Sequence, residues 1–168
     1  THGSETYKKV NGKEGSVIEV GTALTKELEN VYGIKTVHDK SVYDMVDGQL
    51  DRNAAYNFAG DSVEAALRKN PSVKVVIDLH RDSVENNIHL RTKINGKSAA
   101  QIMFFNGVSR LASKGDIGYL YNPNKEANLA FSLQLQAEAM KKYPGLTRKI
   151  YIKGSRSDTK NLYKRLSL

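Results

Sequence analysis

The chain has 168 residues, of which 39% are hydrophobic and 26% are charged, and this is typical of one soluble globular domain. It contains no cysteine, which excludes disulfides and cysteine-ligated zinc. The net charge of +8 favours a polyanionic partner, but no stretch is arginine-rich or interleaved with aromatic residues. We therefore expect no nucleic-acid partner.

The first predicted element is a helix over residues 16–33, SVIEVGTALTKELENVYG. Ser16 and Glu19 have the spacing of a capping box, and Gly33 marks a C-terminal stop. The apolar residues expected on the inner face of this helix are Val17, Val20, Leu24, Leu28 and Val31. Residues 34–40, IKTVHDK, then indicate a short strand.

A second helix is predicted within residues 47–71, and the stretch 41–56 around its start is hard to assign. Pro71 lies just past its end. The residues expected to point inward are Val63, Ala66 and Leu67. A third helix is predicted over residues 125–143, with a Pro-Gly pair after it. Its apolar stripe consists of Leu129, Leu133 and Met140.

Three further apolar runs indicate strands, at residues 73–80 (VKVVIDLH), 99–105 (AAQIMFF) and 148–153 (RKIYIK). The near-continuous apolar run of the first suits the centre of a sheet that is covered on both faces. Residues 81–98 and 106–124 are expected to form loops. Because helices alternate with strands, the fold class is α/β with a mostly parallel sheet.

The run VVIDLHRD places His80 at the end of an apolar strand, which is where open α/β sheets bind ligands. The alternative is a histidine that is satisfied by local hydrogen bonds. The N-terminal THGSETY adds His2 and Glu5 in H-x-x-E spacing. Together the three residues match a known set of catalytic zinc ligands, with a fourth position for water. The alternative for His2 and Glu5 is a solvated tail.

His38 and His89 are the other histidines, and either could replace His2 as a ligand. We expect His38 to be packed or locally hydrogen-bonded and His89, in the candidate hairpin NNIHLR, to lie on the surface. The chain has no G-x-S-x-G elbow and no glycine-rich phosphate-binding motif. Serine hydrolysis and nucleotide binding therefore have little support.

These motifs resemble the catalytic domain of the stage II sporulation protein P family, a branch of the zinc-dependent N-acetylmuramoyl-L-alanine amidases. The resemblance covers roughly residues 1–153, and its specific parts are THxxE and DLHRD. The matching stretches are THGSETY, SVIEVGTALTKELEN with YGIKTVHDKSVYD, VVIDLHRDS, GKSAAQIMFFNG, and NPNKEANLAFSLQLQ leading to YPGLTRKIYIK. It implies one amidase-like catalytic domain over residues 1–168, with a three-layer αβα fold and zinc at the strand ends.

The resemblance also implies a function. The expected reaction is hydrolysis of the amide between N-acetylmuramic acid and the L-alanine of the peptidoglycan stem peptide, with cross-link endopeptidase activity as a second expectation. The family thins the septal wall during engulfment in sporulation, beside a lytic transglycosylase partner. It is anchored to the membrane and works outside the cytoplasm.

By position, His2, Glu5 and His80 match the metal motifs of the family. Arg81 is expected to contact a stem-peptide carboxylate, and the alternative is a local salt bridge. Glu14 is the rival carboxylate ligand, because related amidases place a glutamate just before the first helix. Glu5 is preferred because it lies inside the THxxE match, and Glu14 would then favour the helix N-terminus by its charge.

The chain departs from the family in two places. It begins inside THxxE, without the strand that precedes this motif in the family. Its end, GSRSDTKNLYKRLSL, lacks the E-V-G context of the family's catalytic glutamate, which would be the general base. We therefore expect a segment truncated at both ends, and the alternative function is a non-catalytic peptidoglycan-binding module.

Overall fold

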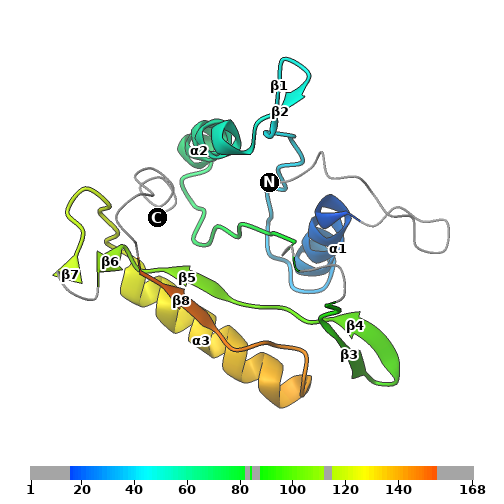
Figure 1. Ribbon diagram of the computed structural model, residues 1–168. Coiled ribbons are helices and arrows are strands. Elements are labelled where there is room, and N and C mark those ends of the chain that lie inside the picture. Colours follow the sequence, from blue (N-terminus) through cyan, green and yellow to red (C-terminus); the bar gives the residue numbers. More distant parts are fainter. Residues whose placement is uncertain (1–15, 82–83, 85–87, 112–114, 155–168) are drawn as a thin grey trace. The chain divides into compact units, whose positions relative to one another are not determined.

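The computed structural model describes the chain except for residues 1–15, 82–83, 85–87, 112–114 and 155–168. The chain divides into two compact units, Thr1–Ser83 and Val84–Leu168. The elements of the first unit are α1 (Val17–Asn30), β1 (Met45–Val46), β2 (Gln49–Leu50) and α2 (Arg52–Lys69). Those of the second are β3 (Arg91–Ile94), β4 (Lys97–Ala100), β5 (Phe105–Gly107), β6 (Arg110–Leu111), β7 (Gly115–Asp116), α3 (Lys125–Lys142) and β8 (Tyr151–Lys153) (Figure 1).

Helix α1 has the capping box that the sequence predicts. The Ser16 hydroxyl accepts a hydrogen bond from the backbone N–H of Glu19 at 3.3 Å, and the Glu19 carboxylate accepts one from the backbone N–H of Ser16 at 2.9 Å. At the other end, Gly33 has a φ of +65° and donates its N–H to the Glu29 carbonyl at 3.2 Å. Both predicted ends of this helix are thus confirmed.

The inner face of α1 differs from the predicted one. Gly21 is buried, whereas Val20 and Val31 are 57% and 61% exposed. A Cβ added at Gly21 would lie 2.5 Å from the Nε2 atom of His38. The segment that follows α1 therefore packs where the helix has no side chain, and apolar periodicity cannot show this because glycine is not an apolar anchor.

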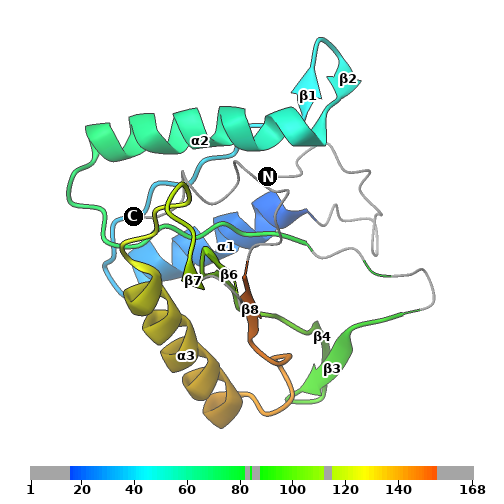
Figure 2. The same cartoon turned by 60° about the vertical axis from the view of Figure 1, so that its left-hand side comes forward.

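Residues 34–40 form no hydrogen-bonded strand, contrary to the prediction. The stretch 41–56, which was hard to assign, contains the antiparallel hairpin β1–β2 and the start of α2. The hairpin turns at Asp47 and Gly48, with φ values of +49° and +78°, as in a type I′ turn. In Figures 1 and 2 it lies at the N-terminal end of α2.

Helix α2 confirms the second predicted helix, which ends before Pro71. Ala55 is 1% exposed, and the predicted inward residues Val63, Ala66 and Leu67 are half-buried. Beyond α2, residues 73–80 form no strand, and Val75 and Ile77 are 49% and 55% exposed. The prediction of a buried strand there is wrong for the described unit, because an apolar run does not determine which backbone it pairs with.

Among the described residues of the second unit, β5 and β8 form one parallel strand pair, in which Phe105 faces Tyr151. Their rings stack with centroids 5.4 Å apart. An isolated parallel bridge between Ile102 and Thr147 continues the same pairing toward the start of both segments. The predicted strand 99–105 is therefore divided between β4, this bridge and β5.

The remaining strand pairs of the second unit, β3–β4 and β6–β7, are antiparallel. The first of them turns at Asn95 and Gly96, with φ values of +49° and +76°. Among the described residues, the sheets thus contain both pairing types. A three-layer αβα fold with a mostly parallel central sheet stays a prediction.

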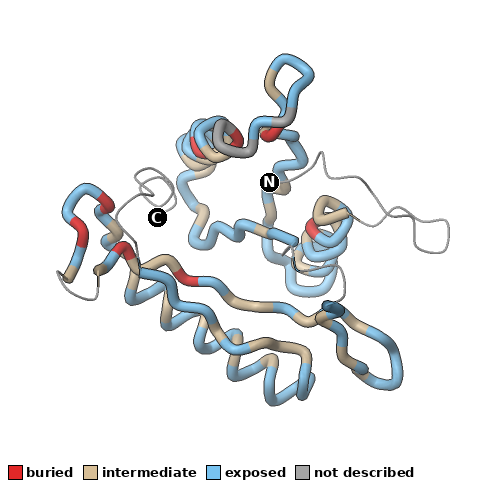
Figure 3. Tube along the Cα trace, viewed as in Figure 1, coloured by how far each residue is buried: buried red, intermediate tan, exposed pale blue. Residues whose placement is uncertain are grey.

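Helix α3 confirms the third predicted helix and contacts β5 (Figures 1 and 2). Its packed face is more polar than the predicted stripe, since Leu133 and Met140 are 47% and 57% exposed. The half-buried residues that replace them beside Leu129 are Ser132, Gln136 and Ala139. Figure 3 shows the most buried residues of this unit in β5 and in the loop that leads to α3.

Candidate functional site

His80 is the one predicted metal ligand that lies in the described part of the chain. Its Nε2 atom lies 2.6 Å from Oδ2 of Asp78, two residues earlier. The side chains of His80 and Asp78 are 33% and 32% exposed. The D-x-H spacing within DLHRD places this carboxylate beside the imidazole.

The Tyr56 ring is stacked near the His80 ring. The ring centroids lie 6.4 Å apart, and the ring planes differ by 22°. Burial raises the pKa of the Tyr56 hydroxyl, and the nearby Asp78 carboxylate raises it further. The phenol therefore stays protonated and uncharged at neutral pH, and the Tyr56 ring is an uncharged neighbour of His80.

The other predicted site residues are distributed unevenly. His2, Glu5 and Glu14 lie outside the described residues, as does Asp82. Arg81 follows His80 and is exposed. Among the residues that the structure describes, no group of three His, Asp or Glu side chains is arranged to hold a metal ion.

The two alternative histidines behave as the sequence predicts. His38 is half-buried and packs against Gly21, and its Nδ1 atom is buried with no hydrogen-bond partner among the described residues. His89 is exposed. Of the two histidines that could replace His2, His89 is thus the more exposed to solvent.

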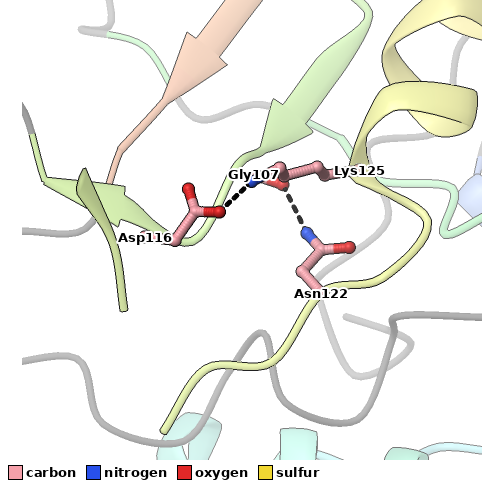
Figure 4. A network of polar contacts seen from close by, with 4 residues as sticks. All are labelled: Gly107, Asp116, Asn122 and Lys125. Carbon is pink, nitrogen blue, oxygen red and sulfur yellow. Dashed lines mark hydrogen bonds and ion pairs between the residues drawn. The ribbon is translucent and has the colours of Figure 1, made fainter. Parts of the chain in front are cut away.

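A second polar cluster follows the carboxyl end of β5, in the loop that leads to α3 (Figure 4). Asn122 donates a 3.1 Å hydrogen bond to the carbonyl of Gly107, and Lys125 forms an ion pair with Asp116. The hydrogen bond from Lys125 lowers the pKa of the Asp116 carboxyl, desolvation opposes this, and the charges of Lys125 and Arg110 lower the pKa further. These contacts hold the loop against the strand end.

The comparisons with known proteins identify the family. The family model of Stage II sporulation protein P (SpoIIP) matches residues 1–166. The chain belongs to the SpoIIP family. Stage II sporulation protein P of Bacillus subtilis (strain 168) is 27% identical over 169 residues, which cover 94% of the chain and 39% of that protein. No solved structure matches the chain.

The surroundings of His80 in this SpoIIP family member fit a metal-ligating histidine. Such histidines almost always donate their other ring N–H to a carboxylate, a carbonyl or a water, and Asp78 is placed to accept it. Sequence analysis singled out His80 but neither Asp78 nor Tyr56. The D-x-H spacing in the sequence could have indicated Asp78. Tyr56 belongs to α2, and its contact with His80 forms only in the folded unit.

No described helix of this SpoIIP family member is both long enough and apolar enough to cross a membrane.

Proposed function

We propose that the chain is the catalytic domain of a zinc-dependent peptidoglycan hydrolase. Its substrate is the amide between N-acetylmuramic acid and the L-alanine of the stem peptide, with cross-linked peptides as a second substrate. The family match over residues 1–166 carries this proposal. The Asp78–His80 contact supports it, because it is the environment that zinc-ligating histidines have.

In this proposal His2, Glu5 and His80 hold the zinc ion. Zinc, when bound, polarises the scissile carbonyl and lowers the pKa of water to about 7. Arg81, which is exposed beside His80, contacts a carboxylate of the stem peptide through its planar guanidinium. No residue is assigned as general base, since residues 154–168 contain no counterpart of the family's late glutamate.

The wider role that we propose is thinning of the septal peptidoglycan during engulfment in sporulation. The partner would be a lytic transglycosylase, and the place of action would be outside the cytoplasm, in a membrane-anchored protein. The net charge of +8 supports a negatively charged wall polymer as the surface on which the chain works, because opposite charge raises the rate of encounter.

The experiment that tests the proposal is metal analysis of the purified protein and of two variants, His2→Ala and His80→Ala. We expect stoichiometric zinc in the wild type and its loss in both variants. His89→Ala tests the alternative in which His89, an exposed histidine of the second unit, replaces His2, and under the proposed ligand set it should keep its zinc. Full zinc content in both ligand variants would show that the assignment is wrong.

A second candidate function is a peptidoglycan-binding module without catalysis. Release of muropeptides from purified sacculi, with and without a chelator, separates the two functions. Release that the chelator abolishes contradicts the binding-only function. Retention on sacculi without any release, by a protein that contains zinc, contradicts the hydrolase.

A further inference from the structure

Asp78 has no role in the proposed zinc set, yet it makes the 2.6 Å contact with His80. Both side chains are about two-thirds withdrawn from solvent, with exposed fractions of 32% and 33%, so water screens their interaction only in part. We propose that Asp78 is a positioning residue, which accepts the Nε2–H of His80 and thereby directs His80 to bind zinc through Nδ1. This inference rests on the proposed function.

The chemical reason lies in the two nitrogens of the imidazole. A neutral histidine carries a proton on one nitrogen and a lone pair on the other, and only the lone pair binds a metal. A carboxylate that holds Nε2–H fixes this tautomer, orients the ring and raises the basicity of the remaining nitrogen. The Asp78 contact is formed within one short segment, so it needs no distant element to be in place.

Tyr56 adds a second constraint on the same ring. Its ring is stacked near that of His80, with the centroids 6.4 Å apart and the planes 22° from parallel. The hydrogen bond of Asp78 acts in the plane of the imidazole, whereas the stacked Tyr56 ring would restrict its tilt out of that plane. Together they would hold the His80 ring in one orientation before the metal arrives, which reduces the entropy lost on binding.

The competing possibility is that Nε2 itself is the metal ligand. The Asp78 contact would then have to break whenever zinc binds, and Asp78 would compete with the metal. The two possibilities differ in which nitrogen of His80 binds the metal. They also differ in whether removing the Asp78 carboxylate weakens or strengthens zinc binding. Both differences are measurable on the purified chain.

The first measurement identifies the nitrogen. Protein with ¹⁵N-labelled histidine and bound ¹¹³Cd in place of zinc should show a cadmium–nitrogen coupling to Nδ1 of His80, with the His80 signals assigned from His80→Ala. A coupling to Nε2 overturns the inference. Because this measurement uses wild-type protein, it decides the question even if a variant at Asp78 fails to fold.

The second measurement is zinc affinity, by competition with a chelator. We expect Asp78→Ala to bind zinc about 10- to 100-fold more weakly, and Asp78→Asn to lose less, because its amide oxygen still accepts the N–H. Asp39→Asn is the matched control, since Asp39 is a carboxylate of the same unit that bonds Tyr43 and Ser62 instead of a histidine. It should bind zinc as the wild type does.

The outcomes separate this inference from the proposed function. A wild type that holds no zinc, or a His80→Ala variant that keeps it, removes the proposed function and the inference with it. Zinc bound through His80 with unchanged affinity in Asp78→Ala overturns the inference alone. Tighter binding in Asp78→Ala does the same, since it would show that Asp78 competes with the metal.

Discussion

Ser132 of α3 donates a 2.8 Å hydrogen bond to Oδ1 of Asn106, a residue of β5 that is 7% exposed. The Nδ2 atom of the same Asn106 is buried and has no hydrogen-bond partner among the described residues. The contact between α3 and β5 therefore includes a polar pair in which, within the described part of the chain, the Oδ1 atom of Asn106 is hydrogen-bonded and its Nδ2 atom is not. Buried polar atoms without partners cost more than their hydrogen bonds gain.

The first prediction concerns this pair. Ser132→Ala should lower the free energy of unfolding by about 1–3 kcal/mol, because it leaves the Asn106 amide buried without any partner. The double variant Ser132→Ala with Asn106→Leu should recover most of this loss, since it removes both polar groups and replaces the amide by an apolar group of similar branched shape. Urea denaturation measures both. Ser98→Ala, at an exposed position of β4, is the control, and a Ser132→Ala variant as stable as this control would contradict the prediction.

The second prediction concerns Asp39 and low pH. Burial raises the pKa of this carboxyl, but hydrogen bonds from Tyr43, Ser41 and Ser62 outweigh it and lower the pKa from 3.8 to about 2. Because the folded pKa lies below the unfolded one, the carboxylate stabilises the folded unit fully above pH 3.8, and this stabilisation is lost as the pH falls toward 2. Since Asp39 is largely exposed, we expect its carboxylate to contribute only about 1 kcal/mol to the free energy of unfolding.

Urea denaturation of the wild type and of Asp39→Asn at pH 5 and pH 2 measures this contribution. At pH 5 the free energy of unfolding should be about 1 kcal/mol higher for the wild type than for Asp39→Asn, and this difference should be lost at pH 2. Tyr43→Phe removes one hydrogen-bond donor to Asp39. The free energy of unfolding of this variant should therefore change less between pH 5 and pH 2 than that of the wild type. The same pH dependence in the wild type and in Asp39→Asn would exclude Asp39 as its source.

The helices could be predicted from the sequence because their signals are local. The Ser16–Glu19 capping box, the stop at Gly33 and the periodicity of α2 all involve residues within a few positions of one another. The packed faces were harder to predict. On α1 the partner segment approaches at Gly21, and on α3 a polar stripe with Ser132 replaces the expected apolar one.

The hairpins had signals that the sequence analysis did not use. Asp47-Gly48 and Asn95-Gly96 are the dipeptides that two-residue hairpin turns prefer, and each pair has positive φ at both residues. The strand predicted from the apolar run at residues 73–80 was wrong for another reason. Its composition suits burial, but a strand exists only when another backbone pairs with it, and nothing in the run itself specifies that partner.

The third prediction concerns the stacking of Tyr56 near His80. Tyr56→Phe keeps the stacked ring and should leave zinc affinity nearly unchanged, whereas Tyr56→Ala should weaken binding about 2- to 10-fold, the amount that an aromatic pair contributes. Competition with a chelator measures the affinities. Tyr32→Ala is the control, because Tyr32 is 66% exposed on the same unit. Equal affinities for Tyr56→Ala and Tyr32→Ala would show that the stacking does not orient the ligand.

The fourth prediction decides between the two candidate carboxylate ligands, Glu5 and Glu14, which both lie outside the described residues. Removing a direct ligand should weaken zinc binding by more than the roughly 10-fold lower limit for residues that only support a ligand. We therefore expect Glu5→Gln to lose stoichiometric zinc and Glu14→Gln to keep it. Both variants conserve side-chain size and remove one negative charge, so each is the control for the other. Loss of zinc in Glu14→Gln with retention in Glu5→Gln would assign the ligand to Glu14, and the THxxE motif would then supply only its histidine.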